Sequence, residues 1–184
     1  YLACINYVDV QIGRLLVELK KRPGNRDTII VLTSDHGWNL GEKTHWCKAA
    51  IWRDTTRVPF IVVSPGITKA GLRNNQPISH VDIYPSLCDF AGIPKPTHLE
   101  GRSILPLLKD QSATRDVAFL SYGPENTAAQ SERYRYLRYE DGSEELYDHK
   151  KDPHEWTNRI GNKKYQKLSQ EEKNNLDGLF MSKV

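Results

Sequence analysis

The chain has 184 residues, of which 38% are hydrophobic and 27% charged, and its formal net charge is +3. This length allows one sizeable core, or one core with a small appended layer, and no apolar run approaches the ~20 residues of a membrane span. Lysines and arginines are scattered along the chain, which argues against the basic stripe of a nucleic-acid-binding protein.

The first part of the chain predicts a helix followed by two buried strands. Apolar residues recur at helical spacing over residues 2–19, and Pro23 follows the end of this amphipathic helix. Residues 28–33 and 60–63 are continuous β-branched and apolar runs. Such runs suit strands that are buried on both faces, as in a parallel sheet.

A second helix is predicted over residues 83–91, with Ser79 or Asp82 as its cap and Gly92 at its end. The order is therefore helix, strand, loop, strand and helix. This order predicts an α/β fold in which residues 1–112 form part of a doubly wound mixed sheet flanked by helices.

Residues 113–184 have a different character and predict a small C-terminal subdomain. Residues 117–122, 134–139 and 144–147 read as short, aromatic-rich strands. Asp141-Gly142 is a suitable hairpin turn between the last two strands. We expect a small antiparallel sheet that is covered by one helix.

The covering helix is predicted close to the C-terminus. Ser169 and Glu172 have the spacing of a capping box, so this helix is expected to begin at Ser169. Its apolar side chains would be Leu176, Leu179 and Phe180.

A dense polar segment follows the first predicted strand. Ligands of open α/β sheets bind at the carboxyl ends of strands, which is where Asp35 and His36 fall. A carboxylate there can hold a hard divalent cation, and the imidazole can join it or bind an anionic ligand. Gly37 permits close backbone approach, and Lys48 could neutralise one charge of an oxyanion.

On these residues alone, a plain loop is an equally good interpretation. Asp35 could merely cap a following turn, and Asp-His-Gly is a common loop composition. Three residues are too few to decide between a metal site and a loop.

Five longer blocks together resemble the C-terminal half of a sulfatase, a family of the alkaline-phosphatase-like superfamily. The blocks are SDHGWNLGEKTHWCK, TTRVPFIVVSPG, SHVDIYPSLCDFAGIP, EGRSILPLL and ELYDHKKDPHEWTN. They run in order from about residue 27 to about residue 158. The Asp-His-Gly form with Trp-x-Lys downstream is most similar to the iduronate-2-sulfatase and choline-sulfatase branch, and within it to iduronate-2-sulfatase.

The resemblance implies roles for particular residues. Asp35 and His36 match a pair that binds calcium, in preference to magnesium, and Lys48 matches the catalytic lysine that contacts the substrate's sulfate. His36 and His45 are further candidates for substrate binding. Arg57 is expected to anchor its loop through an ion pair with a carboxylate such as Asp54.

Other polar residues are expected to be structural or solvated. His80 and Asp82 match a helix-start motif that is structural in the family. His98, His149 and His154 lie in loops rich in proline and charge, and we expect them to face solvent.

The resemblance also implies that the nucleophile lies elsewhere. Sulfatases use a formylglycine made from Cys or Ser in a Cys/Ser-x-Pro/Ala-x-Arg motif, and none of Cys4, Cys47 and Cys88 is followed by it. With no initiator Met and a start that reads as mid-helix, the sequence is expected to be a portion of a longer protein. The formylglycine and the other aspartate ligands would belong to a missing N-terminal half.

The implied function is hydrolysis of a sulfate ester, such as that of a sulfated sugar, by the full-length protein. The portion alone is expected to be inactive. Family habit favours a periplasmic, secreted or lysosomal setting for glycosaminoglycan degradation. Two alternatives stay open: a phosphodiesterase or phosphonate monoester hydrolase of the same superfamily, and a non-catalytic homologue.

Overall fold

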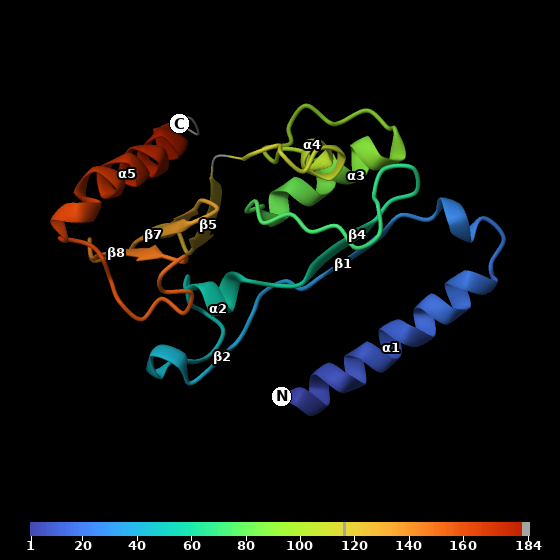
Figure 1. Ribbon diagram of the computed structural model, residues 1–184, viewed down its shortest axis with the longest axis horizontal. Coiled ribbons are helices and arrows are strands. Elements are labelled where there is room, and N and C mark those ends of the chain that lie inside the picture. Colours follow the sequence, from blue (N-terminus) through green and yellow to red (C-terminus); the bar gives the residue numbers. More distant parts are fainter. Residues whose placement is uncertain (116, 182–184) are drawn as a thin grey trace.

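The computed structural model describes residues 1–115 and 117–181, and the side chains within that range up to residue 174. The molecule is elongated, with the N-terminal helix towards one end and the C-terminal sheet with its covering helix at the other (Figure 1). Among the described helices, none is both long and apolar enough to cross a membrane.

The first predicted helix is confirmed as α1 (Leu2–Lys21), which is followed by the short 3-10 helix η1 (Asn25–Asp27). The helix stands apart from the rest of the chain (Figure 1). None of its residues is buried, so its apolar stripe is exposed.

The two predicted core strands are present as β1 (Ile30–Thr33) and β4 (Phe60–Val63). They pair antiparallel, with Ile30 opposite Val63, so the likeness of these runs to strands of a parallel sheet does not extend to their direction. An unbroken apolar run predicts burial on two faces but carries no information about strand direction. In this chain Ile61 is 54% exposed and Val63 47% exposed, so the ribbon is covered only in part.

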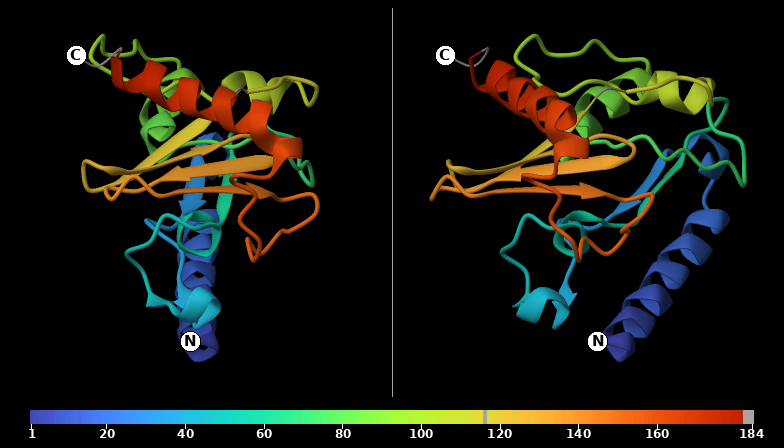
Figure 2. Two further views of the ribbon diagram at one scale, coloured as in Figure 1. Left: turned by 90° about the vertical axis from the view of Figure 1, so that its left-hand side faces the viewer. Right: turned by 60° about the vertical axis from the view of Figure 1, so that its left-hand side comes forward.

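The connection between β1 and β4 contains a small hairpin and one helical turn. The hairpin is formed by β2 (Asn39–Leu40), the 3-10 helix η2 (Glu42–Thr44) and β3 (Trp46–Cys47). The helical turn is α2 (Arg53–Thr56). This excursion carries the residues that the sequence singles out, and it lies below the C-terminal sheet in Figure 2.

After β4 the chain forms η3 (His80–Asp82), α3 (Ile83–Ala91) and α4 (Leu105–Lys109). Ser79 and Asp82, the predicted caps, form a reciprocal capping box at the start of η3, which leads directly into α3. The predicted end is confirmed, since Gly92 adopts a left-handed conformation with φ of 66°.

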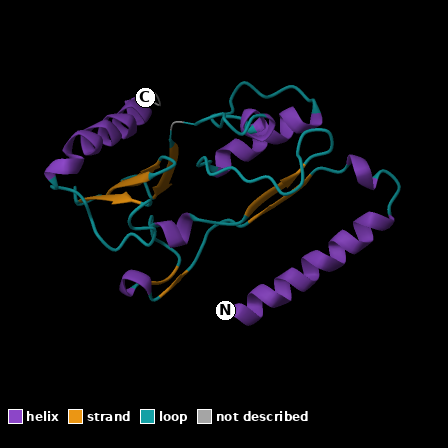
Figure 3. Cartoon of the chain, in the orientation of Figure 1, coloured by secondary structure: helices purple, strands orange, loops and turns teal. Residues whose placement is uncertain are grey.

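The C-terminal sheet has four antiparallel strands in chain order: β5 (Ala118–Tyr122), β6 (Asn126–Gln130), β7 (Tyr134–Arg138) and β8 (Glu144–Asp148). Figure 3 shows it as a group of strands separate from the β1–β4 ribbon. The sequence does not predict strand β6, because Thr127 is the one β-branched or aromatic residue between Asn126 and Gln130. The division of the chain after residue 112 stays a prediction.

The covering helix is α5 (Gln166–Met181), which follows the 3-10 helix η4 (Lys163–Tyr165) and lies over one face of the sheet (Figure 2). The predicted start at Ser169 is wrong. The cap is Asn162, whose side chain accepts the Lys164 N–H, whereas the Ser169 hydroxyl donates to the Tyr165 carbonyl inside the helix. The side chains of Leu176, Leu179 and Phe180 lie outside the described residues.

The described core lies on the two faces of the C-terminal sheet. The face under α5 contains Val117, Ala129, Tyr136, Leu146 and Tyr165. The other face contains Ala128, Leu137 and Tyr147 and packs on Ile51, which lies two residues before the start of α2. Successive residues of each strand point to opposite faces, so both faces are built from the same short sequences.

Candidate active site

The Asp35–His36 segment begins just after β1 and rests on α2. The Gly37 N–H donates to the Thr55 carbonyl at 2.8 Å, and the Trp38 N–H donates to the Asp54 carbonyl at 3.0 Å. A Cβ atom at Gly37 would lie 2.1 Å from the Asp54 carbonyl oxygen. Only glycine permits this approach, so the position of α2 fixes the position of the polar pair.

The Asp35 and His36 side chains face each other. His36 Nδ1 lies 2.8 Å from the Gly37 carbonyl oxygen, so Nδ1 carries a proton and donates it. Nε2 lies 3.3 Å from Asp35 Oδ2, and the Asp35 side chain is 82% exposed. Desolvation acts to raise the pKa of Asp35, but the charge of His36 and backbone hydrogen bonds hold it below its ordinary value.

This donor pair fits part of a cation site. When the His36 ring is neutral and carries its proton on Nδ1, Nε2 has a free lone pair. His36 Nε2 and Asp35 Oδ2 are then two acceptors that face each other, and a cation or a proton between them would relieve their repulsion. However, the described residues contain no group of three or more His, Cys, Asp or Glu side chains that could hold a metal ion. Calcium usually takes about 6–8 oxygen ligands, so Asp35 and His36 would be a minority of such a set.

Lys48 lies at the end of the hairpin, between two residues with left-handed backbone. Cys47 has φ of 73° and Ala49 has φ of 74°, and neither is glycine. Each such residue costs on the order of 1–2 kcal/mol, and strain of this kind is concentrated at functional sites. The Lys48 side chain is exposed and lines a cleft together with Asp35 and His36. The structure therefore brings these three predicted residues together.

His45 has a different environment from the other predicted residues. Its Nε2 donates to the Lys48 carbonyl at 2.9 Å, and its ring makes an edge contact with Trp52 at 5.8 Å between centroids. It does not line the cleft formed by the described residues. The predicted contact of His45 with substrate stays a prediction, but its observed partner is the backbone of Lys48.

The cleft has a volume of about 1280 Å³ and extends from these residues to the C-terminal sheet. Its charged lining residues, histidines aside, are Asp35, Lys48, Arg53, Arg57, Glu132, Arg133, Arg135 and Lys150. Arg133 and Arg135 are paired with Asp148 and Glu155, respectively. The remaining lining still carries an excess of positive charge, which suits an anionic ligand.

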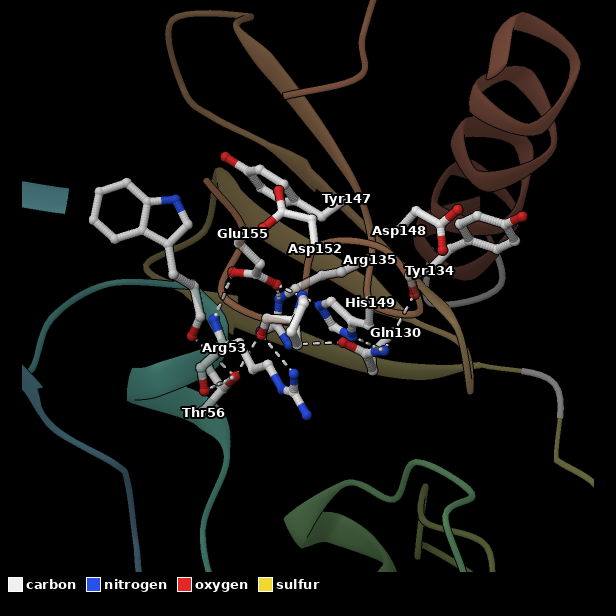
Figure 4. A network of polar contacts seen from close by, with 12 residues as sticks. Arg53, Thr56, Gln130, Tyr134, Arg135, Tyr147, Asp148, His149, Asp152 and Glu155 are labelled. Atoms are coloured by element: carbon white, nitrogen blue, oxygen red, sulfur yellow. Dashed lines mark hydrogen bonds and ion pairs between the residues drawn. The ribbon is translucent and has the colours of Figure 1, made fainter. Parts of the chain in front are cut away.

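Arg135 connects the C-terminal sheet to α2 in the network shown in Figure 4. Its guanidinium donates to the Ile51 carbonyl at 2.8 and 3.1 Å and to Thr56 Oγ1 at 2.7 Å. A fourth donation, at 2.9 Å, goes to Gln130 Oε1 on β6. Burial lowers the pKa of Arg135, and the charge of Glu155 opposes that effect.

Glu155 completes this network from the loop after β8. It adopts a left-handed φ of 59°, is 1% exposed, and accepts the Arg53 N–H at 2.9 Å. Its other oxygen lies 2.7 Å from His149 Nε2. The expectation that His149 faces solvent is wrong, because its side chain is only 10% exposed. His149 lies two residues after Tyr147, so it points to the same face of the sheet as Tyr147. The charged residues and proline around His149 resemble a loop, which is why this alternation does not stand out in the sequence.

Two other predictions have different outcomes. Asp82 is structural, as predicted: it is 2% exposed, accepts the Ser79 and Arg102 N–H groups at 2.7 and 2.8 Å, and pairs with Arg115 at 2.9 Å. The ion pair expected between Arg57 and Asp54 is absent from the described part of the chain. Arg57 is instead exposed and lines the cleft.

The chain thus combines an α/β fold with Asp35, His36 and Lys48 at one basic cleft. The sulfatase family model matches residues 1–93, which is half of the chain. The chain therefore belongs to the sulfatase family.

Two curated relatives show how far the similarity extends. A sulfatase of Formosa agariphila is 39% identical over 166 residues, which cover 90% of this chain and 32% of that protein. A Delta 4,5-hexuronate-2-O-sulfatase of Bacteroides thetaiotaomicron is 32% identical over 187 residues, covering 92% of this chain and 38% of that protein. The chain thus spans about a third of the length of the curated relatives it matches.

Solved structures share the same fold. A protein determined in complex with its substrate D-glucosamine-2-N,6-O-disulfate superposes with a TM-score of 0.83 at 30% identity, covering 97% of this chain and 39% of that one. The phosphonate monoester hydrolase of Agrobacterium radiobacter gives a TM-score of 0.80 at 28% identity, covering 98% of this chain and 40% of that one. The fold is therefore shared by enzymes that act on sulfate and on phosphonate esters.

Proposed function

We propose that this chain is the C-terminal part of a sulfatase that hydrolyses the sulfate ester of a sulfated sugar, and that its preference resembles that of iduronate-2-sulfatase. The observation that carries the proposal is the convergence of Asp35, His36 and Lys48 on one basic cleft. A preference for a uronate sulfated at its 2-position is supported by the SDHGW and LGE motifs, and by a relative whose name is Delta 4,5-hexuronate-2-O-sulfatase.

Each of the three residues has a chemical role in this proposal. Asp35 and His36 would hold one side of a calcium ion, whose charge would polarise the sulfate group when bound. Lys48 would donate hydrogen bonds to a sulfate oxygen and offset the negative charge that develops as the ester bond breaks. The formylglycine nucleophile and the remaining cation ligands belong to the rest of the longer protein.

We propose that the N-terminal part of the longer protein, which would carry the formylglycine, also covers the apolar surface exposed on α1 and β4. The stripe of α1 and the half-exposed face of β4 are apolar areas that the described part of the chain leaves uncovered. Covering them would stabilise the α/β layer and would bring the missing ligands to Asp35. A sulfated-glycan substrate favours a periplasmic, secreted or lysosomal location.

The test is sulfate release by the full-length protein from 4-nitrophenyl sulfate and from a 2-sulfated uronate disaccharide, with calcium and with a chelator. We expect calcium-dependent release that falls by at least about 10²-fold in Asp35→Ala and Lys48→Ala, because each removes charge from the reacting site. Lys163→Ala is the matched control, since Lys163 is an exposed lysine of η4 outside the cleft.

The outcomes separate the proposal from its alternatives. Activity that survives both substitutions would remove Asp35 and Lys48 from the site. Cleavage of a phosphonate monoester without sulfate release would favour the second candidate function, which the phosphonate monoester hydrolase fold supports. No turnover of any ester would favour a non-catalytic homologue. The chain on its own is expected to be inactive, because it supplies too few cation ligands.

A further inference from the structure

Lys43, at the tip of the hairpin, is held by the C-terminal sheet across a large distance in sequence. Its ammonium donates to the Tyr147 hydroxyl at 2.7 Å. It also lies 4.4 Å from the centroid of the Tyr147 ring and 5.0 Å from that of the Trp52 ring. A lysine ammonium so close to two aromatic rings gains cation–π attraction in addition to its hydrogen bond.

The aromatic residues around Lys43 are themselves fixed by one carboxylate. Glu145 Oε2 accepts from Trp52 Nε1 at 2.8 Å, from the Tyr147 hydroxyl at 2.8 Å and from the Tyr139 hydroxyl at 3.2 Å. Burial and then the Glu145 carboxylate raise the pKa of Tyr147, so its phenol keeps the proton that it donates. We call Lys43, Trp52, Tyr139, Glu145 and Tyr147 the Lys43 latch.

The latch connects to Lys48 through two contacts of the hairpin. His45 packs the edge of its ring against Trp52 and donates to the Lys48 carbonyl at 2.9 Å. Lys43 itself has φ of 53° and Thr44 has φ of 59°, both left-handed. A hairpin with strained residues at its tip and beside Lys48 does not hold its shape by local preference and needs an outside contact.

We propose that Lys43 is a positioning residue for the reaction: through the Lys43 latch, the C-terminal sheet sets the orientation of Lys48 in the cleft. This inference rests on the proposed function, because Lys48 is the group that would meet the sulfate. Lys43 does not line the cleft formed by the described residues, so it acts through the hairpin and not on the ligand.

The experiment uses the full-length protein with Lys43→Met, Lys43→Arg and the control Lys163→Met. Methionine keeps an apolar stem of similar length but removes the charge and the donor, whereas arginine keeps both. We measure kcat and KM for sulfate-ester hydrolysis, melting temperature, and hydrogen exchange of the backbone amides of residues 41–49.

Lys43→Met is expected to speed exchange in residues 41–49 about tenfold or more and to lower kcat about 10–100-fold, with a smaller change in KM. The reason is that a displaced Lys48 loses contact with charge that develops in the transition state. Lys43→Arg should restore most of both quantities, and Lys163→Met should match the wild type.

Exchange in residues 41–49 that is as slow in Lys43→Met as in Lys163→Met would overturn the proposal. Faster exchange with unchanged kcat would also overturn it, because the hairpin would then be loosened without consequence for Lys48. If the wild-type protein releases no sulfate, the proposed function fails, while the exchange measurement still tests whether Lys43 holds the hairpin.

Discussion

At the scale of single residues, the site depends on a few contacts that tolerate no extra atom. Gly37 is the clearest case, because its two neighbours in sequence, His36 and Trp38, belong to the segment that α2 supports. The Asp54 carbonyl oxygen occupies the space that any side chain at residue 37 would need. The sequence predicts close approach at this glycine, and the structure identifies what approaches it.

Gly37→Ala is expected to destabilise the protein by about 2–3 kcal/mol, because its Cβ atom would push α2 away from the Asp35–His36 segment. Sulfate release should fall at the same time. Melting temperature and activity of the full-length protein measure the two effects.

Gly66→Ala provides the comparison for this prediction. Gly66 has a left-handed φ of 74°, but nothing lies within 4 Å of the position of its Cβ atom. The control should therefore cost only about 1 kcal/mol and leave activity intact. Equal effects of the two substitutions would show that contact with Asp54 is unimportant.

At the scale of elements, α2 is the piece on which the site rests. The carbonyl groups of Asp54 and Thr55 hold the Gly37–Trp38 backbone, while Arg135 and Glu155 hold α2 from the side of the C-terminal sheet. The two parts of the chain therefore form one polar framework. The loop after β8 thus contacts α2, and α2 contacts the segment that carries Asp35 and His36.

Acid should weaken this framework. Burial acts to raise the pKa of Glu155, but the His149 hydrogen bond and the Arg135 charge outweigh it and hold the pKa below the ordinary 4.5. The unfolded chain therefore takes up this proton first as the pH falls. The contribution of Glu155 to stability is complete above about pH 4.5 and is lost as the pH falls through the lower folded value.

Glu155→Gln measures this contribution. At pH 7 the variant should lose about 3 kcal/mol, because Arg135 stays buried beside a neutral side chain. The difference in melting temperature between wild type and variant should shrink as the pH falls below 4.5. A difference that stays constant from pH 7 to pH 3.5 would refute the assignment of this acid sensitivity to Glu155.

At the scale of the whole molecule, the apolar surface of the N-terminal region is the unsatisfied feature. The C-terminal sheet has both faces covered, whereas α1 buries no residue. Ile5 lies on its apolar stripe and is 51% exposed, and the neighbouring Asn6 faces a different direction, about 100° around the helix. This difference in coverage between α1 and the C-terminal sheet agrees with a chain that spans about a third of the length of its relatives.

Ile5→Asp in the full-length protein is expected to lower the free energy of unfolding by about 2–4 kcal/mol, since it places a charge where the proposed N-terminal portion packs. Asn6→Asp adds the same side chain one position further on and should change stability by less than about 0.5 kcal/mol. Equal melting temperatures for the two variants would place the contact surface elsewhere.

The sequence by itself determined the features that arise within a few residues. The helical spacing of α1, the cap at Ser79 or Asp82, the turn at Asp141-Gly142 and the aromatic-rich runs of three of the C-terminal strands all depend on neighbours in the chain. The motif blocks around Asp35 and Lys48 likewise placed the chain in its family. Strand β6 could not be predicted, because its two alanines are buried but show no alternation of apolar and polar residues.

The tertiary structure alone decided the features that join distant segments. These features are the antiparallel pairing of β1 with β4, the burial of His149 and the position of Arg57 in the lining of the cleft. The bond between Lys43 and Tyr147 spans 104 residues, and the bond between Arg135 and Thr56 spans 79. Such contacts depend on how whole elements pack, and no local preference encodes which residues will meet.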